Sequence, residues 1–161
     1  MKKEISFGLG GKYSVFYLLI LIFNVFSSCR SAEKIVQDKN SFTSIELVKG
    51  GCLDNCMSYS IIISSTGSYS YTGRFNVNKK GEVVGKLSPQ KLADLNTLIK
   101  EMRWDTYKDD YGTQAEDSQR KELKYISTEG QKKVVYFRME PQQIKDLEAY
   151  FDNLIQSDEF K

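Results

Sequence analysis

Short stretches in which apolar and polar residues alternate follow one another between residues 44 and 84. Residues 44–48, 59–63 and 69–77 each show the period of two that is typical of a half-buried β-strand. Turn signals separate them at residues 65–68 and 78–81, and a short extended piece follows around Val83 and Val84. We therefore predict three or four strands, of which the second and third form a hairpin.

Helical spacing replaces the alternation after Ser88, which would cap a helix that has Pro89 at its first position. Residues 105–119 are highly charged and show no period, so a loop is predicted there. A second hairpin is expected from residues 123–126 and 134–139, followed by a final helix from Pro141. Each helix has one apolar stripe, formed by Leu92, Leu95, Leu98, Ile99 and Met102 in the first and by Ile144, Leu147, Phe151, Leu154 and Ile155 in the second.

This order, βββ(β)-α-ββ-α, predicts an α+β domain. Its strands would form an antiparallel sheet, because short turn signals connect most of them. Since each helix has a single apolar face, we expect both helices to pack on one face of the sheet.

The start of the chain has the organisation of a lipoprotein signal peptide. Lysines at positions 2, 3 and 12 precede an apolar run over residues 15–23, which ends in Phe26-Ser27-Ser28-Cys29. The run suits a secretory segment better than a membrane-spanning helix, which needs about 20 apolar residues. Residues 1–28 are therefore predicted to be removed, with a lipid on Cys29 that holds the protein at a membrane. An uncleaved anchor, and secretion with Cys29 as a free thiol, are the alternatives.

Without the signal peptide, the chain consists of a polar tether over residues 29–42 and one domain over residues 43–161. The signal peptide holds three of the 23 basic residues and one of the 21 acidic ones, so the remainder has no net charge. This balance gives no electrostatic basis for binding nucleic acid.

Cys52 and Cys56 lie in the segment Gly50-Gly51-Cys52-Leu53-Asp54-Asn55-Cys56, where paired glycines and Asp-Asn favour a tight loop. Disulfides persist outside the cytoplasm, so a structural disulfide is the favoured interpretation. Redox exchange and binding of a soft ion such as Cu(I), with Met57 nearby, remain open. The chain has no histidine, which excludes His-containing zinc sites. No cofactor is expected.

Two further groups of residues are candidates for ligand binding. The acids of the charged loop would suit calcium, but their spacing does not match a helix-flanked calcium loop, and a solvated loop is favoured. They are Asp105, Asp109, Asp110, Glu116 and Asp117. The strand tyrosines, Tyr59, Tyr69 and Tyr71 first among them, would form an aromatic platform for a sugar or a peptide if they were exposed. Packing between strands explains the same positions and is favoured.

Evidence for catalysis is weak. The absence of histidine removes the commonest general base, and no serine lies in a Gly-x-Ser-x-Gly or Ser-x-x-Lys pattern. A carboxylate-based hydrolase using the acidic loop is the remaining catalytic alternative.

The chain resembles an uncharacterised domain of lipoproteins and secreted proteins of Bacteroidota, whose signature is Gly-Cys, three residues, Cys-Pro, then x-Tyr. The resemblance rests on Gly51, Cys52, Cys56 and Tyr59 and on the apolar strand that follows, and extends from about Ser44 to the last helix. Met57 stands where the family usually has proline. The resemblance implies a fold and an exported location but no activity.

Together these observations predict a lipid-anchored protein of the cell envelope, facing the periplasm or held at the outer membrane. We expect a non-catalytic binding or interaction module whose partner is an envelope protein or a glycan. The alternative is a thiol-redox or soft-metal protein that uses Cys52 and Cys56, and the second alternative is the hydrolase.

Overall fold

The structure, a computed structural model, describes residues 42–113, 118–157 and 160. The predicted signal peptide, Cys29 and the tether up to residue 41 lie outside these residues, as do Glu116 and Asp117 of the charged loop. None of the helices in the described part of the chain is both long and apolar enough to span a membrane.

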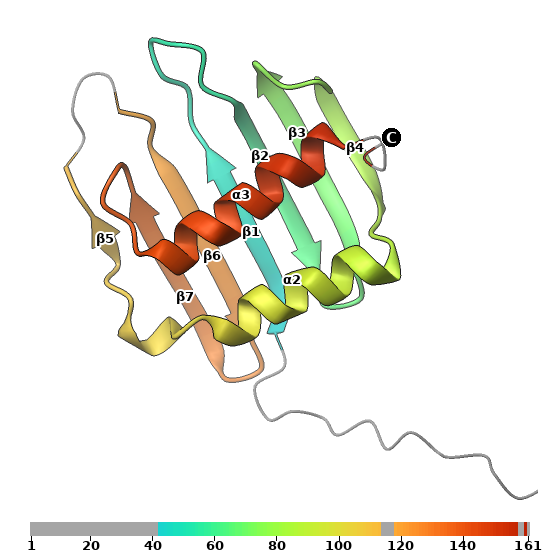
Figure 1. Ribbon diagram of the computed structural model, residues 1–161, viewed down its shortest axis with the longest axis vertical. Coiled ribbons are helices and arrows are strands. Elements are labelled where there is room, and N and C mark those ends of the chain that lie inside the picture. The colour runs from blue at the N-terminus through green and yellow to red at the C-terminus, as the bar shows by residue number, and fades with distance from the viewer. Residues whose placement is uncertain (1–41, 114–117, 158–159, 161) are drawn as a thin grey trace, which may run out of the picture. The chain divides into compact units, whose positions relative to one another are not determined.

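The described chain forms a seven-stranded sheet covered on one face by two helices (Figure 1). In chain order the elements are β1 (Phe42–Lys49), β2 (Ser58–Ser64), β3 (Ser68–Phe75), β4 (Gly81–Lys86), α2 (Pro89–Glu101), the 3-10 turn η1 (Trp104–Thr106), β5 (Asp110–Tyr111), β6 (Lys121–Ser127), β7 (Gly130–Tyr136) and α3 (Gln142–Gln156). The strands lie in the order β4-β3-β2-β1-β6-β7-β5, and all neighbours are antiparallel except β5 and β7. The predicted α+β class is confirmed.

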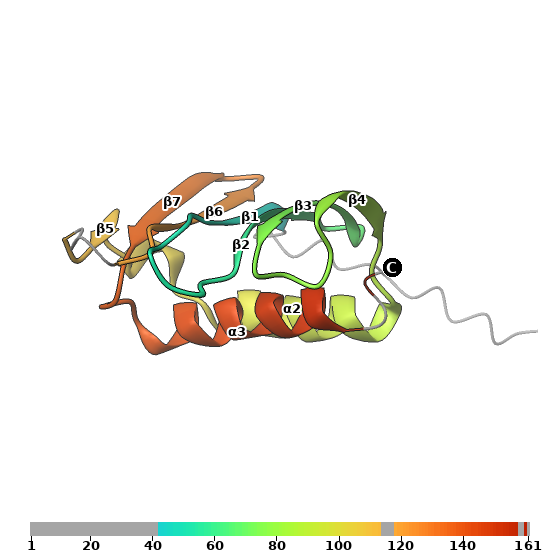
Figure 2. The ribbon, with the colours of Figure 1, turned by 90° about the horizontal axis from the view of Figure 1, so that it is seen from above.

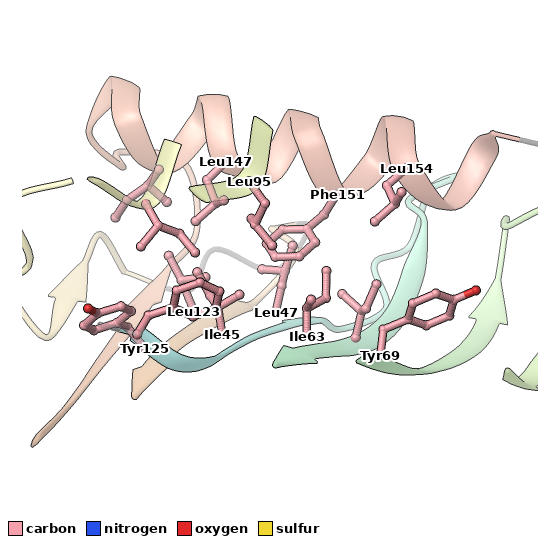
Figure 3. Packing of buried hydrophobic residues seen from close by; sticks show 14 of the residues in the cluster. Ile45, Leu47, Ile63, Tyr69, Leu95, Leu123, Tyr125, Leu147, Phe151 and Leu154 are labelled. Carbon is pink, nitrogen blue, oxygen red and sulfur yellow. The ribbon is translucent and has the colours of Figure 1, made fainter. Parts of the chain in front are cut away.

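Both helices lie on the same side of the sheet, in a single layer (Figure 2). The cap predicted for the first helix is present, because the hydroxyl of Ser88 accepts a hydrogen bond of 3.4 Å from the backbone N–H of Lys91. The apolar stripes supply the core: Leu95 of α2 and Leu147, Phe151 and Leu154 of α3 face the sheet residues Ile45, Leu47, Ile63 and Leu123 (Figure 3). Burying these side chains is the main stabilisation of the fold.

The sequence prediction was wrong in one segment. Residues 105–119 were expected to be a loop, but the last two residues of η1 and the two-residue strand β5 lie within them. Asp110 and Tyr111 pair with Val135 and Tyr136 and add a parallel edge strand to the sheet. A two-residue strand has no measurable periodicity, so the alternation of apolar and polar residues could not reveal it.

Candidate functional site

The cysteine pair predicted from the sequence forms a disulfide between Cys52 and Cys56, with a Cα–Cα distance of 5.9 Å. The loop that it closes joins β1 to β2 and is held from two sides. The side-chain amide of Gln119 donates to the carbonyls of Gly50 and Met57 at 2.7 Å each, and the amide of Asn76 donates to the carbonyl of Cys56 at 3.1 Å. In the disulfide form the cysteine pair anchors the β1–β2 loop.

The strand tyrosines belong to the core. Tyr59, Tyr69 and Tyr71 are all buried. Phe160 stacks on Tyr69 at a centroid distance of 4.6 Å and meets Tyr71 edge-on at 4.8 Å. These tyrosines therefore do not form an exposed platform for a sugar or a peptide. Their rings pack between strands and against Phe160 in the core.

The acids of the charged loop do not come together as a calcium site. Asp109 pairs with Lys132 of β7, and Asp105 is an exposed residue of η1. Glu116 and Asp117 lie outside the residues that the structure describes. Within the described ranges, no group of three or more Cys, Asp or Glu side chains has a geometry that could hold a metal ion.

A row of polar side chains crosses the helix-facing side of the sheet, and the sequence analysis missed it. Tyr59, Lys49, Lys121 and Tyr136 occupy paired positions on the four adjacent strands β2, β1, β6 and β7. The two lysines are only 4% and 8% exposed. We call these four residues, together with Glu140, Glu148 and Asp152, the polar row.

Helix α3 and Glu140, which lies two residues before it, supply the counter-charges. Lys49 Nζ lies 2.8 Å from Glu148 Oε1 and 2.8 Å from Asp152 Oδ2. Lys121 Nζ lies 2.9 Å from Glu148 Oε2 and 3.1 Å from Glu140 Oε1. Lys121 also sits over the ring of Tyr136, at 4.7 Å from its centroid. Glu148 therefore bridges the two lysines, and the network connects four strands to α3.

The environment of the polar row changes the pKa values of its members. Burial raises the pKa of Glu148, but hydrogen bonds and ion pairs with Lys49 and Lys121 outweigh it and hold that pKa below its ordinary value. Burial, reinforced by the nearby carboxylates, raises the pKa values of Tyr59 and Tyr136 far above their ordinary value. The carboxylate thus stays ionised and the phenols stay neutral at physiological pH, as a buried and paired network requires.

A groove of about 900 Å³ lies at the opposite end of the sheet from the disulfide loop. It is bounded by the start of β1, the end of α2, η1 and the β6–β7 hairpin, which meet at the lower end of the sheet in Figure 1. Its walls mix rings, amides and charges of both signs, among them Trp104, Tyr125, Asn96, Gln131, Lys100 and Asp105. This volume is in the range of sites that hold small ligands.

Trp104 is the central residue of the groove wall. Its ring stacks on that of Tyr125, with centroids 4.2 Å apart and planes 7° from parallel, and Tyr107 meets it edge-on at 5.9 Å. Its indole N–H is buried and has no hydrogen-bond partner among the described residues. A buried donor without a partner is costly, but the atom has almost no exposed surface, so a ligand acceptor would reach it only if the side chains around it moved.

Two signals in the sequence point to these features in retrospect. Lys49 continues the alternate positions of β1 that hold Ile45 and Leu47, and Lys121 begins the alternate positions of β6 that hold Leu123 and Tyr125. Side chains at alternate positions of a strand point to the same face, so both lysines face the core. Glu148 and Asp152 lie four residues apart beside the apolar stripe of α3. No comparable signal marks the groove, because its residues come from separate elements.

The fold and its sites define a small α+β domain with an open-faced sheet, one groove wall built on an aromatic stack and a buried polar row. Residues 43–155 match the domain of unknown function DUF6438, and the chain belongs to this family. No curated protein and no solved structure matches the chain significantly.

Proposed function

We propose that this protein is a lipid-anchored, non-catalytic binding module of the bacterial cell envelope and that its ligand occupies the Trp104 groove. The N-terminal sequence supports the anchor, through the signal pattern that ends at Cys29. The groove of ligand size, with the stacked rings of Trp104 and Tyr125 in its wall, is the observation that carries the assignment of the site.

The lining of the groove favours a ligand that is amphipathic and rich in hydrogen-bond acceptors. Trp104 and Tyr125 offer an aromatic surface, while Asn96 and Gln131 offer amide donors and acceptors. Sugar rings combine apolar C–H faces with many oxygen acceptors. An oligosaccharide of the cell envelope therefore fits this chemistry best.

Trp104 is the only tryptophan in the chain, so its fluorescence reports directly on the groove. Titration with soluble peptidoglycan fragments should produce a saturable change in emission. Calorimetry should give the same affinity and should lose it in Trp104→Ala, which removes the ring that stacks on Tyr125 in the groove wall. Gln131→Ala should weaken binding about tenfold or less, as expected for one hydrogen bond.

A matched control for the groove is Thr97→Ala, on the exposed side of α2, which should bind as the unaltered protein does. Absence of any saturable signal with millimolar glycan fragments would contradict the assignment of an oligosaccharide. The anchor is tested separately, by metabolic labelling with a fatty acid: the unaltered protein should carry the label and Cys29→Ala should not, and an unaltered protein without label would contradict lipidation.

A further inference from the structure

Exposed apolar side chains gather at the end of the sheet that lies opposite the groove. The large apolar residues exposed in the described chain are Leu53, Ile62, Phe75, Val84 and Met139. Three of them, Leu53 at 81%, Phe75 at 63% and Met139 at 74%, lie in or beside the connections that follow β1, β3 and β7. We call residues 50–57, 74–81, 118–120 and 137–141 the loop end; its connections lie at the top of the sheet in Figure 1.

The structure holds these connections in place. Leu53 lies inside the ring closed by the Cys52–Cys56 disulfide. Asn76, next to Phe75, hydrogen-bonds the carbonyl of Cys56, and the N–H of Gly50 donates to the carbonyl of Arg120 at 2.9 Å. Little conformational entropy is therefore lost when the apolar side chains of the loop end contact a surface.

The three apolar residues form a row rather than a patch. Phe75 ends β3 and Met139 follows β7, and these strands are four positions apart in the sheet. At about 4.8 Å per strand spacing, the row is about 19 Å long. Protein partners need a contiguous buried core, whereas a lipid surface needs only apolar side chains that reach one plane.

Basic residues accompany the row. Arg74 precedes Phe75 and Arg138 precedes Met139, and both are exposed. The described part of the loop end also contains Lys79, Lys80 and Arg120, with Arg120 paired to Glu122. Its acids are Asp54 and Glu140, of which Glu140 is paired with Lys121. Glu116 and Asp117 of the neighbouring segment fall outside the described residues.

We propose that the loop end is a membrane-contact surface that rests on anionic lipid, with Leu53, Phe75 and Met139 entering the headgroup region. Apolar side chains flanked by arginine and lysine are what an anionic bilayer surface binds. The contact needs no lipid on Cys29, so it can be tested independently of the proposed function.

The length of the tether is compatible with both attachments at once. Phe42 lies 13 positions after Cys29, and a fully extended chain of that length spans about 45 Å. The eight-residue strand β1 spans about 26 Å between the groove end and the loop end. A lipid on Cys29 can thus reach the same membrane as the loop end, and the groove would then face away from it.

The first test uses the chain of residues 37–161, which forms one compact unit and contains every core residue from Phe42 to Phe160. It is sedimented with vesicles of phosphatidylethanolamine and phosphatidylglycerol, and with vesicles of phosphatidylcholine. We expect binding to the anionic vesicles that weakens with salt. The triple variant Leu53→Ser, Phe75→Ser, Met139→Ser should bind at least about tenfold more weakly, since three apolar side chains stay in water.

The matched control is the double variant Ile62→Ser, Val84→Ser, whose residues are 40% and 76% exposed and lie on the outer face of the sheet. It should bind vesicles as the unaltered chain does. The variants alter exposed residues, and equal urea midpoints will establish that all are folded. No binding of the unaltered chain to either kind of vesicle would overturn the proposal, and so would equal losses in the triple variant and the control.

A second measurement tests the orientation. Trp104 lies in the groove, so lipids brominated along their acyl chains should leave its fluorescence unquenched when the loop end is bound. Strong quenching would place the groove at the membrane and overturn the proposal. Glycan binding in the groove should be unchanged in the triple variant, which separates this inference from the proposed function.

Discussion

The hydroxyl of Tyr59 donates a 2.6 Å hydrogen bond to Asp152 Oδ1, joining β2 to a residue 93 positions later in α3. The other oxygen of the same carboxylate lies 2.8 Å from Lys49 Nζ. Asp152 is thus shared by a phenol and an ammonium from two adjacent strands. Its position is determined by directional contacts, whereas the apolar stripe of α3 would tolerate small shifts along the sheet.

Removing one buried charge from the polar row should lower the free energy of unfolding, because the remaining charges lose their partner. Lys49→Met leaves Glu148 and Asp152 without one of their cations, and breaking such a pair costs about 3–5 kcal/mol of unfolding free energy. Tyr59→Phe removes one hydrogen bond and should cost about 1–3 kcal/mol. Urea denaturation followed by circular dichroism measures both.

The control is Lys133→Met in the more exposed pair with Glu122, which should cost less than about 1 kcal/mol of unfolding free energy. Equal losses for the two lysines would contradict the role of burial.

Stability should fall in acid because of Glu148. Its pKa in the folded protein is held below the ordinary value by Lys49 and Lys121, against the opposing effect of burial. The unfolded chain therefore binds a proton at higher pH than the folded chain does. The stabilisation from these pairs is fully present above the unfolded pKa of about 4.3 and is lost as the pH falls through the folded pKa. Urea titrations from neutral pH down to this range measure the slope.

Glu148→Gln should reduce the slope of the unfolding free energy against pH in acid, because the substituted residue does not titrate. Glu101→Gln, at an exposed position of α2, should leave the slope unchanged. A slope that is the same with and without Glu148 would show that other carboxylates cause the loss.

The disulfide should contribute modestly. A ring with a sequence separation of four removes little entropy from the unfolded chain, and the chain-entropy relation gives about 2 kcal/mol. The double variant Cys52→Ser, Cys56→Ser should therefore remain folded at room temperature and keep its groove ligand. A thiol-redox or soft-metal protein would instead lose its function outright with the same change. Denaturation and ligand titration of the one variant distinguish these two classes of protein.

Gly73 should not tolerate a side chain. A Cβ atom at this position would overlap the carbonyl oxygen of Lys79 and lie 2.5 Å from the hydroxyl of Tyr71, which itself donates to that carbonyl. Because the obstacle is backbone, Gly73→Ala should cost about 2–3 kcal/mol or prevent folding. Gly51→Ala, which would meet no atom within 4 Å, should change stability by less than about 1 kcal/mol. Similar results for the two variants would show that the β3–β4 turn can move aside.

The sequence indicated the strands and helices well because their periods were intact. Residues 44–48 became part of β1, and the five apolar residues assigned to the last helix all lie buried on α3. The polar row was missed because the alternation was read only for apolar residues. A buried lysine is rare enough that its position in the alternation seldom suggests one, and Lys49 is 103 positions away from its partner Asp152.

The groove could not be predicted, for a different physical reason. Trp104 and Tyr125 stack although 20 residues lie between them, and the other walls come from α2 and the β6–β7 hairpin. A surface of this kind exists only after the elements have packed. The sequence did point to the disulfide, where two cysteines lie close enough along the chain for local geometry to decide.

The polar row also determines when this chain can fold. Lys49 and Lys121 lie on the helix-facing side of strands that precede α3 in the chain, and their counter-charges come from Glu140 onwards. Until that C-terminal segment is in place, this face of the sheet lacks its cover, so its apolar side chains lie in water and the two ammonium groups have no counter-charge from α3. Truncated chains should thus stay open and be degraded rapidly, so only a complete polypeptide yields a protease-resistant product.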